Sequence, residues 1–354
     1  MQGRLPVFDI LRVLATLAVI GIHVSADYAS ASWGGLLFNQ ITRFSVPMFI
    51  IISGFLLYFQ DQNHSQPESV LVFYHKRFGK IIAPYVIWTV LYTLMNQYLL
   101  HTWPDVPQLA TVIIRHLLWG TGTYHLYFMV IIIQCYLLYP LLKAWLEKHS
   151  LSFVFSLLLL CMLCQVALYL HTIGIHPLPT LAHPQLYLIA FPIWVGYFGL
   201  GMYMAQFRTR LETVLTSGGW LWGILWLLSL VLLVGDSYVT GSYASSGKPT
   251  IMLYVIMSLL FFYKLALQYQ DKKPRLFHWL SRQSFLIYFS HPVALLFLQR
   301  IVHKIGLSSA WQGGGGMLLL YVLTVVITVI AVYAVRDFPW LWLLGGQSRK
   351  SRPV

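Results

Sequence analysis

Residues 7–24 read Val7-Phe-Asp-Ile-Leu-Arg-Val-Leu-Ala-Thr-Leu-Ala-Val-Ile-Gly-Ile-His-Val24, and this stretch decides the fold class. An apolar helix of about 20 residues is long enough to cross a hydrocarbon core of ~30 Å. Arg12 and His23 nevertheless lie inside it, and a charge at that depth costs at least about 2.5–3.5 kcal/mol, so such residues usually mark a functional site. Their spacing places both on one helical face, ~16 Å apart along the axis. Asp9 and Thr16 share that face, so the sequence predicts a polar line across the membrane.

The composition indicates a polytopic membrane protein. The 354-residue chain is 58% hydrophobic and only 9% charged, whereas soluble domains carry about 25% charged residues. The net charge of +13 could indicate nucleic-acid binding. The basic residues are, however, scattered in short segments between apolar stretches, which is typical of the positive-inside rule and of contact with anionic lipids. We therefore expect membrane lipids as partners, and no nucleic acid.

The apolar segments predict an all-α bundle of about ten transmembrane helices in a single membrane-embedded domain covering residues 1–354. The first segment is too long and too charged for a signal peptide, so we expect a permanent helix. Leu109–Trp119 is too short to cross and is predicted to be interfacial or re-entrant. The expected spans are 7–25, 42–59, 79–100, 125–146, 151–171, 187–206, 219–235, 250–270, 284–303 and 315–335.

The distribution of Lys and Arg predicts the orientation. Alternate inter-span segments hold most of them: Arg4; Lys76, Arg77 and Lys80; Lys143 and Lys148; Arg208 and Arg210; Lys264, Lys272, Lys273, Arg275 and Arg282; and Arg336, Arg349, Lys350 and Arg352. The opposite side holds only Arg115, Lys248, Arg300 and Lys304. We therefore expect both termini in the cytoplasm and an even number of spans.

Several kinds of site are absent from the sequence. There is no phosphate-binding glycine loop, no HExxH, no GxSxG and no zinc-ligand spacing, so we expect no metal and no permanently bound cofactor. Cys135, Cys161 and Cys164 lie inside spans, and the Cys161-x-x-Cys164 pair is better explained as apolar filler than as a redox or metal site. With ten acidic residues in all, a pump built on carboxylate relays is disfavoured.

Two residues in the first two spans are the main candidates for chemistry. The imidazole of His23 can exchange a proton near neutral pH or carry an acyl group; the alternative is a buried histidine satisfied by one hydrogen bond. Arg43 opens the second span, on one face with Pro47 and Gly54, and its fork of donors could stabilise an oxyanion or hold an anionic group. The alternative for Arg43 is an interfacial side chain whose charged end reaches water. Gly54 would let another backbone or a ligand approach closely.

Further candidates lie in later segments. His125 stands in Tyr124-His-Leu-Tyr-Phe128, which could equally be an interfacial aromatic belt. Tyr288 and His291 share a helical face, and Pro292 should free a backbone carbonyl there. One basic cluster could dock a phosphate-rich donor, or could serve only topology and lipid contact; its members are Lys76, Arg77 and Lys80.

These motifs resemble the acyltransferase 3 family of bacterial membrane proteins. The resemblance rests on Arg12 followed eleven residues later by His23, and on the segment Arg43-Phe-Ser-Val-Pro-Met-Phe-Ile-Ile-Ile-Ser-Gly-Phe-Leu56. It continues in His125-Leu-Tyr-Phe128, where Tyr127 replaces the family's Trp, and in Leu280-Ser-Arg-Gln-Ser-Phe-Leu-Ile-Tyr-Phe-Ser-His-Pro292. The chain looks most like stand-alone members that O-acetylate surface polysaccharides.

The resemblance implies transfer of an acyl group, usually acetyl, from cytoplasmic acyl-CoA to a carbohydrate hydroxyl, by an enzyme of the bacterial cytoplasmic membrane. We expect His23 to act as general base or acyl carrier and Arg43 to stabilise the oxyanion or orient the acceptor. Arg12, held by Asp9, would contact the donor or keep the polar line charged. His125 and His291 are expected to bind the acceptor or relay protons, and Asp9, Tyr127 and Tyr288 are expected to help bind the substrates.

Two other classes of function remain open from the sequence. An exporter of exopolysaccharide or lipid-linked sugar would need a wide polar lumen, whereas acyl transfer needs a narrow tunnel open to the cytoplasm. A non-catalytic membrane scaffold would leave the costly Arg12, His23 and Arg43 unexplained. The sequence does not specify the acceptor, the length of the acyl group or the oligomeric state.

Overall fold

The protein is described by a computed structural model that covers residues 5–63, 69–175, 178, 185–244, 246–272 and 275–348. Over these residues every regular element is a helix, which confirms the all-α membrane class. Five basic residues used to predict the orientation lie outside the described residues; they are Arg4, Lys273, Arg349, Lys350 and Arg352.

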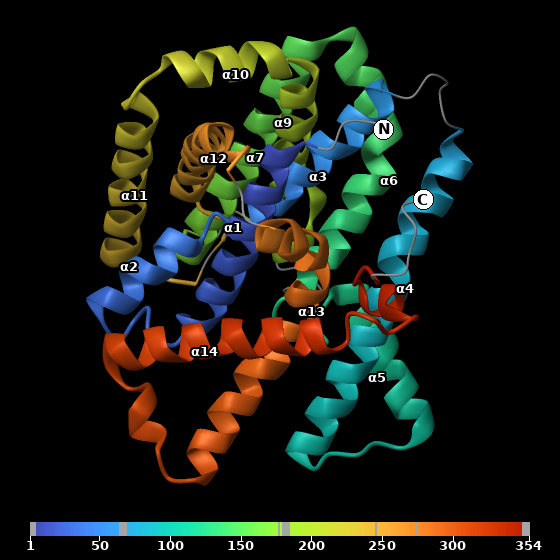
Figure 1. The fold of residues 1–354 in the computed structure, drawn as a ribbon, viewed down its shortest axis with the longest axis vertical. Helices are drawn as coiled ribbons and strands as arrows, with labels where there is room; N and C mark the ends of the chain where they lie inside the picture. The colour runs from blue at the N-terminus through green and yellow to red at the C-terminus, as the bar shows by residue number, and fades with distance from the viewer. Residues whose placement is uncertain are drawn as a thin grey trace.

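The elements follow one another without a strand in the described ranges (Figure 1). They are α1 (Pro6–Val24), α2 (Trp33–Thr42), α3 (Ser45–Gln62), α4 (Val70–Leu100), α5 (Val106–Trp119), α6 (Tyr127–Lys148), α7 (Ser150–Thr172), α8 (Leu186–Ile189), η1 (Phe191–Ile193), α9 (Val195–Gln206), α10 (Arg208–Ser217), α11 (Leu221–Thr240), α12 (Pro249–Tyr269), α13 (Arg275–Lys304), η2 (Ser308–Trp311), α14 (Gly313–Ala334) and η3 (Leu341–Leu344).

Within the described ranges, nine segments are long and apolar enough to cross a membrane, with α2 and α3 counted as one stretch, Trp33–Gln62. They coincide with nine of the ten expected spans. The remaining expected span, 187–206, is the sixth along the chain and is not a single helix. It is divided into α8, η1 and α9. Pro192 lies in η1 and has no N–H to donate to a continuous helical ladder, so a single long helix does not form there.

The short helix α9 is stabilised by backbone-to-backbone packing against α3. A Cβ added to Gly201 would lie 2.0 Å from the carbonyl oxygen of Ile51, and one added to Gly54 would lie 2.2 Å from that of Phe198. On another face of α9, a Cβ at Gly196 would lie 2.7 Å from the Cβ of Cys161 in α7. Small residues allow helices in lipid to approach this closely and gain van der Waals contact. The expected close approach at Gly54 is therefore a backbone approach.

The helices α4 and α5 form a hairpin at one end of the molecule (Figure 1). The N-cap Asp105 accepts from the N–H of Gln108 and Gly120 ends α5 in the left-handed conformation, so local chemistry fixes both ends of α5. With 14 residues and no buried side chain, α5 is not among the candidate spans. This agrees with the prediction that the segment is too short to cross.

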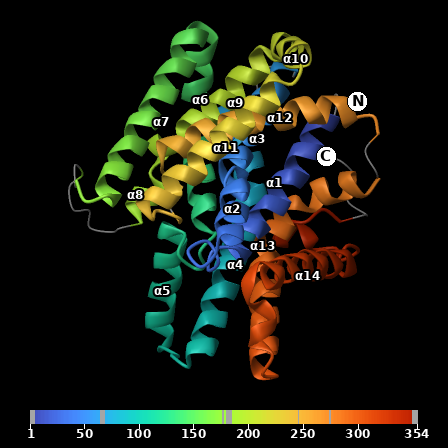
Figure 2. The ribbon, with the colours of Figure 1, turned by 90° about the vertical axis from the view of Figure 1, so that its left-hand side faces the viewer.

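The last two long helices depart from a simple up-and-down bundle. The helix α13 changes direction part-way along its length (Figure 2), and Pro292 inside it accounts for the bend. The helix α14 lies across the long axis of the molecule in both views, although its composition would allow it to span a membrane. The helix α1 packs against both α13 and α3, which places the predicted polar line in the interior.

Candidate active site

Three histidines from distant parts of the chain meet at one end of α1. The ring centroid of His23, in the last turn of α1, lies 5.4 Å from that of His291 in α13 and 6.3 Å from that of His125, just before α6. The rings of His125 and His291 are 5.4 Å apart. His125 and His291 are buried and His23 is partly buried. We call these three residues the histidine cluster; the sequence had singled out each of them separately.

Proline fixes the tautomer of His291. Because Pro292 has no N–H, the carbonyl of Tyr288 has no donor four residues ahead in the helix. Nδ1 of His291 lies 2.7 Å from that carbonyl oxygen. A carbonyl oxygen can only accept, so Nδ1 carries the proton and, in the neutral ring, Nε2 is an acceptor. Nε2 is buried and has no hydrogen-bond partner among the described residues, so the protein leaves this acceptor unused.

The ring of His125 is enclosed by aromatic side chains. The Tyr288 ring lies 4.9 Å away and the Tyr92 ring 5.5 Å away, both edge-on. The hydroxyl of Tyr288 donates to the backbone carbonyl of His125 and so ties α13 to this segment. Neither ring nitrogen of His125 has a partner among the described residues, and the residue is 1% exposed. Unsatisfied buried groups of this kind cost about 1–3 kcal/mol and call for an explanation.

The histidine cluster reaches the surface through Tyr124. Its ring lies 4.4 Å from that of His23, and its side chain is 51% exposed. His23 and Tyr124 therefore form the accessible edge of the cluster, while His125 and His291 form its interior. Within the described part of the chain, no group of three or more His, Cys, Asp or Glu side chains is arranged to hold a metal ion.

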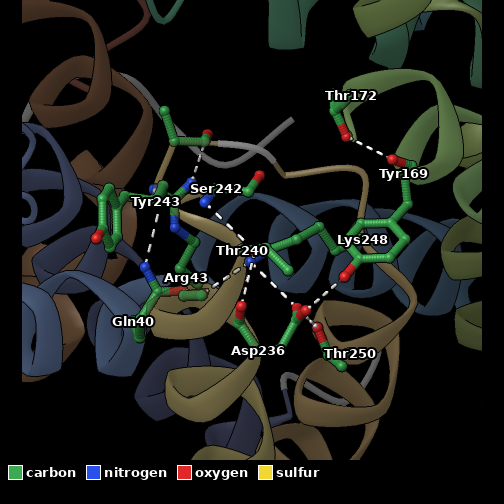
Figure 3. A network of polar contacts seen from close by, with 12 residues as sticks. Gln40, Arg43, Tyr169, Thr172, Asp236, Thr240, Ser242, Tyr243, Lys248 and Thr250 are labelled. Atoms are coloured by element: carbon green, nitrogen blue, oxygen red, sulfur yellow. Dashed lines mark hydrogen bonds and ion pairs between the residues drawn. The ribbon is translucent and has the colours of Figure 1, made fainter. Parts of the chain in front are cut away.

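Arg43 is buried at the junction of α2 and α3, and all its donors are used by the protein (Figure 3). Its Nε and Nη2 donate to Oδ1 of Asn39, at 3.1 and 2.7 Å. Nη2 also donates to the carbonyl of Tyr243, and Nη1 donates to the carbonyl of Ala244 at 2.8 Å and to Oγ of Ser246 at 3.4 Å. A guanidinium has five N–H groups, so none is left over. The alternative of an interfacial side chain reaching water does not describe this residue.

The Arg43 contacts continue into an ion pair between a buried lysine and a partly exposed aspartate, neither of which the sequence marked as a site residue (Figure 3). Lys248 is fully buried; its Nζ lies 3.2 Å from Oδ2 of Asp236 and donates to Ser237 at 2.7 Å. Asp236 also accepts from Tyr169 and Thr250. Ser237 donates to Gln40, which donates to Asn39, the partner of Arg43. Polar contacts therefore fix Tyr243 and Ala244 on one side and Lys248 on the other. Asp236 lies inside an apolar helix, and the rule that singled out Arg12 could have found it too.

The other predicted residues occupy separate places. Asp9 is buried and accepts from Ser281 of α13 at 2.8 Å, while Arg12 is partly buried one turn further along α1. Tyr127 is buried beside Trp194, with a ring separation of 6.3 Å, and is not in ring contact with the histidine cluster in any described pair.

The predicted basic cluster lies on the first part of α4. Lys76 and Lys80 are exposed, and Arg77 donates to Gln60 at 2.9 Å. Lys80 and Tyr92, whose ring contacts His125, are about 18 Å apart along α4. A cavity of about 250 Å³ opens near the start of α4 and is lined by Asp61, Val70, Phe73, Tyr139, Pro140, Lys143, Ala144 and Glu147. The basic residues and the histidine cluster are therefore well separated along the molecule.

Comparison with known proteins agrees with the motifs. Residues 5–336 match the acyltransferase 3 family model, described as "Acyltransferase domain". A Bacillus subtilis (strain 168) protein named "Putative membrane-bound acyltransferase YfiQ" is 27% identical over 296 residues, which cover 79% of this chain and 78% of that protein. No solved structure matches. The chain, with its buried histidine cluster and membrane-spanning helices, belongs to the acyltransferase 3 family of membrane O-acyltransferases.

Proposed function

We propose that this enzyme of the bacterial cytoplasmic membrane transfers an acyl group, most simply acetyl, from cytoplasmic acyl-CoA to a hydroxyl of a cell-surface or lipid-linked carbohydrate. The observation that carries the proposal is the histidine cluster, because three imidazoles meet in an apolar interior and one edge is accessible. Imidazole is the side chain best suited to move a hydroxyl proton near neutral pH. Two arginines also remain part of the proposal: Arg12, which is partly buried, and Arg43, which is buried.

In the proposed reaction His23 is the general base. Its neutral ring takes the proton of the acceptor hydroxyl as the oxygen adds to the thioester carbonyl carbon, so the new C–O bond forms while the carbonyl electron pair moves to oxygen. When that pair returns, the C–S bond breaks and the leaving thiolate takes the proton back from His23. The products are an ester and CoA, and His23 is regenerated. In the alternative with an acyl-His23 intermediate, the donor alone would leave the enzyme acylated.

The remaining site residues support the two substrates. Lys76, Arg77 and Lys80 would attract the phosphates of the donor, and Arg12 would lie further along its route into the bundle. Because the donors of Arg43 are all engaged, we assign it the task of holding the 243–246 loop, and through it orienting the acceptor. Asp9, Tyr127 and Tyr288 would keep the walls of the site in place.

The test is acyl transfer with His23→Ala and His23→Gln. Purified protein is incubated with radiolabelled acetyl-CoA and a carbohydrate acceptor, and labelled glycan is counted. Loss of a general base should lower the rate by about 10²–10⁴-fold. The exposed His303 provides a matched control, since His303→Gln should keep the wild-type rate.

Each outcome has a distinct meaning. If a folded His23 variant keeps the full rate, the role of His23 is wrong. If the wild-type protein labels no acceptor but moves a glycan across vesicles, the protein is an exporter. A labelled protein after incubation with donor alone would establish the covalent route.

A further inference from the structure

Acyl transfer needs a hydrogen-bond donor where negative charge develops on the carbonyl oxygen. Such donors must lie 2.7–3.1 Å from the oxyanion, and the loss of one costs about 10²–10³ in kcat. Arg43 is the candidate that the sequence suggests, but its five N–H groups all donate to Asn39, Tyr243, Ala244 and Ser246. The donor must therefore be sought among the groups that the protein leaves without a partner.

His125 is such a group. Both of its ring nitrogens are buried without a partner among the described residues, in direct ring contact with His23 and His291. The burial of His125, which is 1% exposed, disfavours a charged imidazole. A neutral imidazole still has one N–H, and a neutral histidine can polarise a carbonyl in an enzyme.

The other two histidines are less suited to this role. The single N–H of neutral His291 is already donated to the carbonyl of Tyr288, so only its acceptor nitrogen remains. His23 lies at the accessible edge beside Tyr124 and must present an acceptor nitrogen if it is to take a proton. His291 therefore has no free N–H, and His23 is the ring that must take a proton, which leaves His125 as the ring whose N–H can serve as the donor.

We propose that His125 is a catalytic residue whose ring N–H stabilises the oxyanion of the tetrahedral intermediate; this rests on the proposed acyl transfer. As the acceptor oxygen adds to the carbonyl carbon, the carbonyl π pair moves onto oxygen and is held by the hydrogen bond from His125. When the pair returns, the C–S bond breaks and the thiolate receives its proton from His23. His125 keeps its own proton throughout.

The test compares side chains that differ in whether they can donate. His125→Leu and His125→Phe remove the donor, and the second keeps a ring of similar size. Both should lower kcat on the order of 10²–10³-fold while the KM for donor and for acceptor stays within about twofold. His125→Gln keeps an N–H and should recover at least about tenfold of the lost kcat. The pH profile of His125→Gln should keep the wild-type shape, since His125 neither gains nor loses a proton in the cycle.

Several results would overturn the assignment. A full kcat in His125→Leu or His125→Phe would exclude a catalytic role. A raised acceptor KM with an unchanged kcat would make His125 a binding residue only. Equal losses in the Gln, Leu and Phe variants would point to packing instead of donation. If the wild-type enzyme itself transfers no acyl group to any alcohol, the proposed function fails, and with it this assignment; an active wild type with an active His125→Leu overturns only the assignment.

Discussion

Lys248 has no exposed surface, yet its ammonium group carries a charge that the surrounding protein must balance. Burial lowers the pKa of Lys248, and the carboxylate of Asp236 opposes that shift, while Arg43 adds to it. Asp236 keeps two further donors, Tyr169 and Thr250, and is partly exposed. Lys248 therefore depends on Asp236 to balance its charge more than Asp236 depends on Lys248.

We expect Asp236→Asn to destabilise the protein more than Lys248→Met. Removing Asp236 leaves a buried cation near Arg43 without its counter-ion, and breaking a buried pair in this way costs about 3–5 kcal/mol. Removing Lys248 leaves Asp236 with its other donors, so the loss should be about 1–2 kcal/mol. Free energies of unfolding in detergent measure both.

The double variant Asp236→Asn with Lys248→Met completes this cycle. It should be more stable than Asp236→Asn alone, because the unpaired charge is gone. A double variant as unstable as the sum of the two single variants would show that the ion pair does not act as a unit.

Among the secondary-structure elements, the pair α3–α9 depends on glycine. The backbones meet at Gly54 and Gly201, where any added Cβ would overlap a carbonyl oxygen of the neighbouring helix. Neither glycine has a positive φ. Glycine is therefore required at these positions by the lack of space for a side chain and not by the backbone conformation. At such a backbone contact there is no side chain that could move aside to make room for a larger residue.

Gly201→Ala should therefore lower the thermal midpoint of unfolding strongly, because α3 and α9 must separate to admit the methyl group. The matched control is Gly235→Ala in α11, where nothing lies within 4 Å of the added Cβ. In that open position alanine should stabilise the helix by about 0.5–1 kcal/mol. Equal behaviour of the two variants would contradict the close packing of α3 on α9.

At the scale of the whole molecule, the orientation in the membrane remains a prediction. The basic residues of the described loops place Arg210, in α10, on the cytoplasmic side and Ser309, in η2, on the outer side. In a Cys164→Ser background, which removes the one cysteine that is not buried, Ser309→Cys should react with a membrane-impermeant maleimide in intact cells. Arg210→Cys should react only after permeabilisation. Labelling in the reverse order would invert the topology and place the histidine cluster at the cytoplasmic face.

The sequence predicts those features of the molecule that are local. A long apolar run in a membrane usually forms a helix, because its backbone must satisfy its own hydrogen bonds, so the helical class and nine candidate spans follow from composition. The three clustered histidines were found because titratable groups in apolar segments are costly. The break before α9 depended on Pro192, inside a run that still looked apolar throughout.

The rest of the site depends on contacts between distant segments. Arg43 meets residues about 200 positions away in the chain, and no spacing rule connects them. The position of α14 across the molecule depends on how neighbouring helices pack and not on its own hydropathy. Pro292 predicted a freed carbonyl, but the sequence does not show that Nδ1 of His291 turns toward this carbonyl and leaves Nε2 without a partner, because that depends on the conformation of the side chain.

The shortness of α9 has a consequence for how this helix is held in the molecule. Its 12 residues extend about 18 Å, against ~30 Å for a hydrocarbon core. Most of this helix is covered by protein, because α3, α6 and α7 pack against it and nine of its 12 residues are buried. A helix of this length cannot cross a bilayer alone, so neighbouring helices must hold it in place. A substitution that loosens α3 from α9 should therefore displace a segment that the hydrocarbon core alone would not hold.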